Sequence, residues 1–418
     1  MGQANGKRDI EEGLRLFKAC KEEKANKLWK QTLDRTKDRN IRFIMIRHII
    51  SALFGMGRYR DCATLAIEQL TSANMLDRKD YKAEAYWNLA RSNARSGEFQ
   101  KALSFGKHAL SNTSQKDNDG QLLGWIHLAL AESHLGFSDF QGALEQAERA
   151  LRQATGTDNL VLECETYVIY GDVYLTLKDY DKAMKFYIRS SEMIRCLGQP
   201  WSPQLRATVL LKLANGNRKQ RVLDRALQYC EDAMKLAMEE RDYAMQARCL
   251  ASLGDIHRSR KDVEKAHSKY EASWSQAGEI GDHVCQLYIL MGLIKIFMSS
   301  REFEKANEAA ARGLEVGSGI GSKIHVLRCH WFLYQLYMNS EERTLSQDHA
   351  KKFDGLLREL QLYCGVCHDV IGKQKDNVYV MECCHIYHSK CVENSAFRSK
   401  GCPNCKISSG LFSKPFSV

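Results

Sequence analysis

The feature that most constrains the fold of this chain is a repeat with a period of about forty residues. An aromatic or aliphatic residue, or another large residue in the same context, is followed three positions later by a small one. The small positions recur 37 to 43 residues apart. They are Ala25, Cys62, Ala102, Ala143, Ala183, Ala226, Ala266 and Ala306. Most have a second small residue twelve positions earlier, namely Gly13, Ala90, Ala131, Gly171, Ala214 and Gly254, whereas Ile50 and Ile294 stand there in two units.

This spacing predicts two antiparallel helices per unit, whose backbones approach closely at the small residues. The chain has only four prolines, and residues 1–199 and 204–402 contain none, which favours helix. One helix pair cannot bury its own apolar face, so the units must stack into a solenoid. The pattern resembles the tetratricopeptide repeat family, lengthened from about 34 to about forty residues. Ser202 and Pro203 suit the N-cap and first turn of a helix.

A final helical region is expected over residues 321–363. Its second part places His349, Phe353, Leu356, Leu360 and Tyr363 at steps of four, three, four and three. This heptad-like pattern covers only about two heptads, fewer than a confident coiled coil needs. It predicts either a docking or self-association helix, or a helix that caps the solenoid.

The last part of the chain holds eight metal-ligating side chains in the pattern C-x2-C-x15-C-x-H-x2-H-x2-C-x10-C-x2-C. They are Cys364, Cys367, Cys383, His385, His388, Cys391, Cys402 and Cys405. Eight thiol and imidazole ligands in pairs are what two tetrahedral zinc ions require. The alternative is a chance cluster of core cysteines, although seven of the fifteen cysteines fall within these 42 residues.

The spacing suggests that the ligand pairs alternate between two zinc ions. One ion would take Cys364, Cys367, His388 and Cys391, and the other Cys383, His385, Cys402 and Cys405. Cys384 is surplus and could replace Cys383 as a ligand. The pattern resembles the RING-H2 finger family.

The amino terminus suggests a lipid anchor. Gly2 would be exposed for myristoylation after methionine removal, but the usual Ser or Thr at position 6 is Gly6 here, so the motif is matched only in part. One myristoyl chain anchors only marginally. Residues 1–48 hold 13 Lys/Arg and 7 Asp/Glu, and this excess could attract anionic lipid. The alternatives are a frayed terminus and a solvated helix face.

Several classes of protein are excluded by the remaining sequence. The most apolar run, residues 41–57, is interrupted by charges, so we expect no transmembrane segment. No secretory signal is visible. The net charge is +10, but basic and acidic residues alternate along the helices, which argues against nucleic-acid binding. Single cysteines in helical patterns beside a zinc site indicate a reducing compartment.

The order of parts resembles the rapsyn family of receptor-associated synaptic scaffolds. Local stretches are also similar: residues 1–3, 56–59, 89–93, 255–260, 362–365 and 402–405. The resemblance implies a myristoylation segment (1–9), seven or eight repeats (10–320), capping or coiled-coil helices (321–363), a RING-H2 finger (364–405) and a tail (406–418). Gly6 and Cys384 are where the sequence departs from the family pattern or adds to it.

The resemblance implies a scaffold at the cytoplasmic face of the postsynaptic membrane. Such a protein clusters nicotinic acetylcholine receptors through their cytoplasmic loops, self-associates, and contacts dystroglycan and the cytoskeleton. The alternative function is a RING-type ubiquitin or ubiquitin-like ligase. In that case Val366, Pro403 and Lys406 would contact the conjugating enzyme, and the repeats would hold the substrate. The stacked repeats also predict a curved surface, which Trp87, Trp125, Trp201 and Trp274 would either line or support as core residues.

Overall fold

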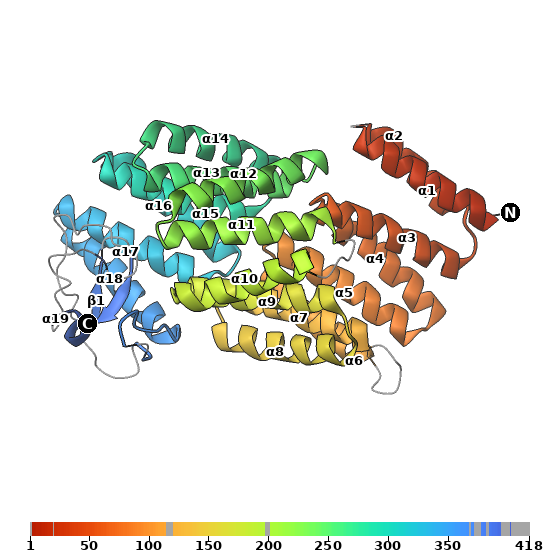
Figure 1. Cartoon of the computed structure of the whole chain (residues 1–418), viewed down its shortest axis with the longest axis horizontal. Coiled ribbons are helices and arrows are strands. Elements are labelled where there is room, and N and C mark those ends of the chain that lie inside the picture. Colours follow the sequence, from red (N-terminus) through yellow and green to blue (C-terminus); the bar gives the residue numbers. More distant parts are fainter. Residues whose placement is uncertain are drawn as a thin grey trace.

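A computed structural model describes most of the chain. The described residues are 2–19, 21–113, 120–196, 201–367, 369–371, 378–381, 384–393 and 402. Within them the chain is almost entirely helical, with a small two-stranded sheet near the carboxyl end (Figure 1). The predicted all-α solenoid is confirmed.

Eighteen helices pack as nine consecutive antiparallel pairs in the described part of the chain. The pairs are α1 (Gly2–Lys18) with α2 (Glu22–Arg35), α3 (Arg39–Gly55) with α4 (Tyr59–Leu76), α5 (Lys79–Ser96) with α6 (Phe99–Asn112), α7 (Gly120–Gly136) with α8 (Phe140–Gly156), α9 (Leu160–Thr176) with α10 (Tyr180–Cys196), α11 (Pro203–Lys219) with α12 (Leu223–Glu239), α13 (Tyr243–Ser259) with α14 (Val263–Ile280), α15 (His283–Ser299) with α16 (Phe303–Gly319), and α17 (Lys323–Asn339) with α18 (Arg343–Glu359). From α5 to α17, successive odd-numbered helices also contact one another and form an inner layer.

The small residues of the repeat lie where the two helices of each pair cross. All eight positions from Ala25 to Ala306 are fully buried. In the fifth pair, a Cβ added to Gly171 would lie 2.3 Å from the ring of the buried Tyr187. Close backbone approach therefore explains why a small residue recurs once in each helix pair, as predicted.

The sixth helix pair begins at Ser202 and Pro203. Helix α11 starts at Pro203, and the Ser202 hydroxyl accepts a hydrogen bond from the Leu205 amide at 3.2 Å. The N-cap predicted at Ser202 is confirmed.

Of the heptad-like residues, His349, Phe353 and Leu356 lie on α18 in the ninth helix pair, whereas the helix ends before Leu360 and Tyr363. Phe353 and Leu360 are buried, and Phe353 packs on Trp331 of α17 with ring centroids 5.3 Å apart. Ser346, also buried, lies 40 residues after Ala306 and so continues the repeat. Because this apolar face is already covered by α17, the geometry favours the capping role over a free docking helix.

The four tryptophans occupy different environments. Trp201 is buried in the core beside Leu205. Trp87 and Trp125 are partly exposed on neighbouring inner helices, with ring centroids 6.3 Å apart, and Trp274 lies under the Arg312 guanidinium. Trp201 is thus a core residue that packs between helices, whereas Trp87 and Trp125 line the inner layer.

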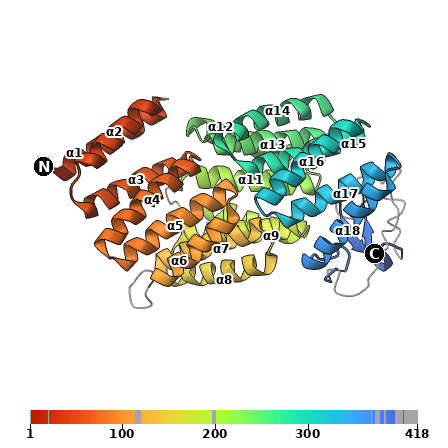
Figure 2. The same ribbon diagram turned by 180° about the vertical axis from the view of Figure 1, so that it is seen from behind.

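The solenoid winds so tightly that units five apart touch. The α3–α4 turn meets the start of α13, where Gly57 faces Asp242, and the α5–α6 turn meets the start of α15, where Gly97 faces Val284. The α7–α8 turn meets the start of α17, where Ser138 Oγ accepts from the Ile324 amide at 3.0 Å. Figures 1 and 2 show the result: two rows of helices lie side by side, and helices α1 and α18 are at opposite ends.

Candidate metal centre

A small finger follows α18. Strand β1 (Val378–Val380) pairs antiparallel with β2 (Ile386–His388), with Tyr379 opposite Tyr387, and the short helix α19 (Ser389–Glu393) follows directly. A turn at Cys364–Cys367 precedes the strands. The turn, the end of β2 and α19 each supply candidate ligands.

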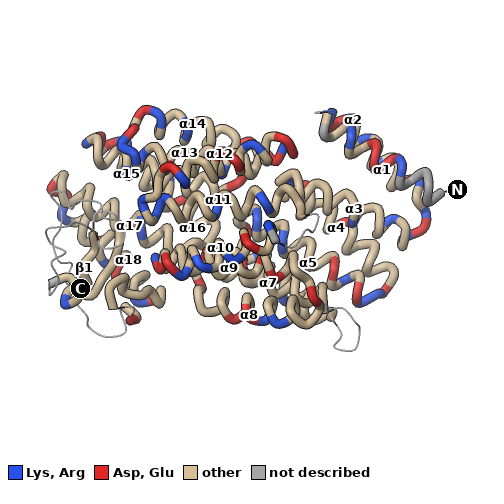
Figure 3. Tube along the Cα trace, in the orientation of Figure 1, with Lys and Arg blue, Asp and Glu red and all other residues tan. Residues whose placement is uncertain are grey.

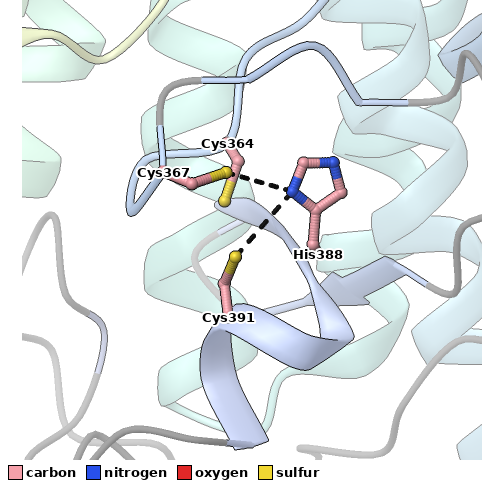
Figure 4. Close-up of side chains that lie close together, drawn as sticks. All are labelled: Cys364, Cys367, His388 and Cys391. Carbon is pink, nitrogen blue, oxygen red and sulfur yellow. Dashed lines mark hydrogen bonds between the residues drawn. The ribbon is translucent and has the colours of Figure 1, made fainter.

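Four of the predicted ligands converge at one point. Cys364, Cys367, His388 and Cys391 each direct a ligand atom into a space in which these atoms all lie within 4.8 Å of one another. Cys367 Sγ is 3.3 Å and Cys391 Sγ 3.9 Å from His388 Nδ1 (Figure 4). The structure thus brings together the four residues predicted for the first zinc ion.

The donor set fits a tetrahedral zinc ion. Zinc bond lengths to sulfur and nitrogen place neighbouring S and N ligand atoms about 3.6 Å apart, and the two observed distances lie on either side of this value. The electrostatics agree. Burial and the neighbouring thiols Cys367 and Cys364 raise the pKa of Cys391 to about 12, so crowded thiolates are unstable without a cation. Burial opposes ionisation of Cys364 as well, but backbone amides of Cys367, His388 and Val366 lower its pKa.

The second predicted ligand set is only partly described. Cys383 and Cys405 lie outside the described residues, whereas His385 and Cys402 are both buried. His385 Nε2 is 2.9 Å from the Tyr180 hydroxyl, an arrangement that turns Nδ1 to the other side of the ring. Cys402 Sγ is 3.1 Å from the Tyr387 hydroxyl. The second zinc ion stays a prediction, as does the choice between Cys383 and Cys384.

The finger docks on the solenoid as a tenth unit would. Lys178, in the α9–α10 turn, donates a hydrogen bond to the Cys384 carbonyl at 2.6 Å, and Tyr180 contacts His385 beside it. This continues the contacts between units five apart. Lys178 and Tyr180 were missed in the sequence, where 206 and 205 residues separate them from their partners.

The other predicted site residues fall at the edges of the structure. Gly2 is the first residue of α1, which is the first helix of the first pair. Val366 lies between two ligand cysteines and is partly exposed. Pro403 and Lys406 lie outside the described residues.

A helical-repeat solenoid with a terminal Cys/His metal finger is the class of protein that this fold and site define. The chain is 41% identical to the chicken (Gallus gallus) 43 kDa receptor-associated protein of the synapse over 97% of its own length and 98% of the relative's. It is 34% identical to the Tetronarce californica protein of that name, over 98% of both chains. The chain belongs to the family of these proteins, the rapsyn family.

Family models match parts of the chain consistently with this assignment. Residues 1–80 match the rapsyn N-terminal myristoylation and linker region. Residues 49–117 and 165–195 match tetratricopeptide repeats. The amino-terminal and repeat regions expected from the sequence are therefore recognised independently of the metal finger.

Solved structures resemble the solenoid. A Rap protein complexed with competence and sporulation factor has a TM-score of 0.59 at 14% identity, covering 85% of this chain and 99% of its own. A Rap conjugation gene regulator in complex with the Phr* peptide has a TM-score of 0.55 at 13% identity, covering 86% and 96%. At these identities the likeness establishes the fold alone.

Among the described residues, none of the helices combines the length and the apolar character that crossing a bilayer requires.

Proposed function

We propose that this protein is a peripheral membrane scaffold that clusters nicotinic acetylcholine receptors at the postsynaptic membrane and links them to the cytoskeleton. The observation that carries the proposal is the near full-length relationship to proteins named for receptor association at the synapse. The scaffold would lie on the cytoplasmic face, where the thiols of its buried cysteines stay reduced.

The architecture suits a scaffold. Contacts between units five apart tie the solenoid into one stiff body, and the finger is fixed to the same body through Lys178 and Tyr180. A stiff body with several binding surfaces raises the effective concentration of the partners it holds. A lipid at Gly2 would add confinement to the membrane plane, so that receptor loops, dystroglycan and further copies of the chain meet in two dimensions.

Membrane attachment is the step that a single substitution tests. Gly2→Ala removes the amino-terminal glycine that myristoylation requires. We therefore expect most of the protein to move from the membrane fraction to the cytosol. The remaining basic excess of residues 1–48 is interspersed with acids along α1 and α2 (Figure 3), so it binds weakly alone. Fractionation of cells expressing the full chain measures this. Gly355→Ala, the same change in an exposed part of α18, serves as the control. Unchanged membrane association of Gly2→Ala would rule out the lipid anchor.

The alternative is a RING-type ubiquitin or ubiquitin-like ligase. Val366 supports it, because this apolar side chain stays partly exposed in the turn between the candidate metal ligands Cys364 and Cys367. A finger of this kind binds the charged conjugating enzyme and performs no covalent step itself. Pro403 and Lys406 would complete the contact, and two zinc ions would hold the surface in shape.

Val366→Ala separates the two functions. If the finger recruits a conjugating enzyme, ubiquitin or ubiquitin-like transfer in vitro should fall at least about tenfold, because an apolar contact at an interface centre is lost. Zinc content should not change, since Val366 is not a ligand. Val161→Ala, at an exposed position of α9, should leave transfer intact. Equal transfer by both variants would exclude this contact, and receptor clustering that survives Val366→Ala would make scaffolding the dominant function.

A further inference from the structure

The inner layer of the solenoid carries a recurring polar position. In each odd-numbered helix from α5 to α15, the residue directly after the small residue, or after Ile294 in α15, is polar: Arg91, Glu132, Asp172, Asn215, Asp255 and Lys295. The polar residue shares one helix face with three others on the same helix, namely those six and two positions before the small residue and five positions after it. These four positions follow one another at steps of four, three and four, which keeps them on one side of a helix. This face therefore lines the interior of the superhelix.

Acids and bases balance at the amino-terminal end of this face. Arg95 pairs with Glu132 at 2.9 Å, and Lys212 pairs with Asp172 at 2.7 Å. These contacts connect α5 with α7 and α9 with α11. The charges there are structural ion pairs between neighbouring units.

Between α11 and α17, the basic side chains outnumber the acidic side chains that could pair with them. Arg218 and Arg258 both bind the carboxylate of Asp255, at 2.8 and 2.7 Å. Lys219, Lys295 and Arg328, which also lie on the odd-numbered helices, have no ion-pair partner within the part of the chain that the structure describes. Asp255 is the one acid among the groups that act most strongly on Lys219 and Lys295. Five basic side chains thus share one carboxylate. Blue segments lie on α11 and α17 in Figure 3.

The five cations act on one another. Burial, Arg218 and Lys295 lower the pKa of Lys219 well below its usual value. Burial, Arg258 and Arg328 lower the pKa of Lys295 to about 8. The cations are poorly compensated by the protein, and the helices that carry them, α11, α13, α15 and α17, are successive neighbours in contact.

The same region is accessible to solvent and has unused hydrogen-bonding groups. Tyr288 of α15 occupies the inner face six residues before Ile294, yet 56% of its surface is open to solvent. His325 Nε2 and Arg218 Nε are buried and have no hydrogen-bond partner. A solvent-accessible, cationic inner face with unpartnered buried polar atoms is the environment expected for an anion site.

We propose that the inner face of α11, α13, α15 and α17 binds a compact polyanion of the class of multiply phosphorylated small molecules, with Lys219, Lys295 and Arg328 as its direct contacts. The charge excess requires several negative charges in a small volume. An extended acidic peptide presents side chains on one side only about every 7 Å. Contacts between units five apart bring opposite sides of the solenoid together, which favours a small ligand over a folded partner. This site is independent of receptor binding and of ligase activity.

Titration calorimetry of the full, zinc-loaded chain with inositol hexakisphosphate as the probe tests the proposal. We expect binding that weakens with salt and at least tenfold weaker binding in the double variant Lys219→Gln/Lys295→Gln. Lys235→Gln, at an exposed position on the outer helix α12, should bind like the native chain. Equal affinity of the site variant and the control would overturn the proposal. A hexaglutamate peptide that binds more tightly than the phosphorylated probe would overturn the ligand class in favour of an acidic peptide.

Stability provides a second readout that does not depend on the probe. The pKa of Lys295 is about 8 in the folded chain and 10.5 in the unfolded chain, so the unfolded chain holds more protons between these values. Stability without ligand should therefore rise with pH from about 8 to 10. The titratable and charged groups that interact with Lys295 are Arg218, Lys219, Asp255, Arg258, His325, Arg328 and Cys384. Lys295→Gln should raise the Tm at pH 7 and reduce the pH dependence. A lower Tm and an unchanged pH slope would show that Lys295 is not held against repulsion.

Discussion

Cys364→Ser should release the metal ion of the first ligand set and unfold the finger while the nine helix pairs stay folded. Cys364 is fully buried at the centre of the four converging ligands, and a serine hydroxyl is a poor zinc ligand. Structural zinc contributes about 10–16 kcal/mol to the folding of small fingers. Two three-residue strands and a five-residue helix cannot replace that contribution.

Three measurements check this expectation together. Zinc content should fall by the ion of this site, proteolysis should cleave the chain after Leu362, and helical circular dichroism should hardly change. Cys230→Ala removes a buried cysteine from α12, outside the finger, and should retain all the zinc. A Cys364→Ser protein with native zinc content would show that these four residues do not form the site.

Gly171→Leu should have the next largest effect, because it fills the closest backbone approach of the fifth helix pair. A Cβ at this position would lie 2.3 Å from Tyr187, which is fully buried and whose hydroxyl donates to Asp172 at 2.7 Å. The ring has no free space to enter. Overpacking of this kind costs about 1–3 kcal/mol per site and more where a large side chain must be accommodated. We expect a loss of about 3 kcal/mol or more in chemical denaturation.

Gly355→Leu is the matched control. A Cβ on Gly355 would have open space around it on the exposed face of α18. Leucine is the better helix former, so this variant should gain about 0.5–1 kcal/mol. Similar losses in the two variants would mean that the close approach at Gly171 is not what limits the side chain there.

The repeat could be predicted from the sequence because its cause is local. A small residue is needed wherever two helices of one pair cross, and Ala102, Ala143 and Ala183 record that need every 40 or 41 residues. The ninth pair was interpreted differently, although Ser346 continues the period. Its partner position twelve residues earlier is Tyr334, so the small-residue signal is only half present.

The candidate metal cluster was also predictable, because Cys364, Cys367, His388 and Cys391 lie close together in the sequence and their spacing reflects tight turns. The docking of the finger was not. The Lys178 contact with Cys384 depends on the pitch of the whole superhelix, to which every helix pair contributes a small rotation. The charge excess around Lys295 has the same origin, since α11, α13, α15 and α17 must first be placed side by side.

The most direct test of the account is the distribution of a nicotinic acetylcholine receptor in cultured cells that co-express this protein. We expect dense receptor patches with the native chain and diffuse receptors with Gly2→Ala expressed at the same level. Receptors that stay diffuse with the native chain, although the chain itself reaches the membrane, would contradict the scaffold and favour the ligase.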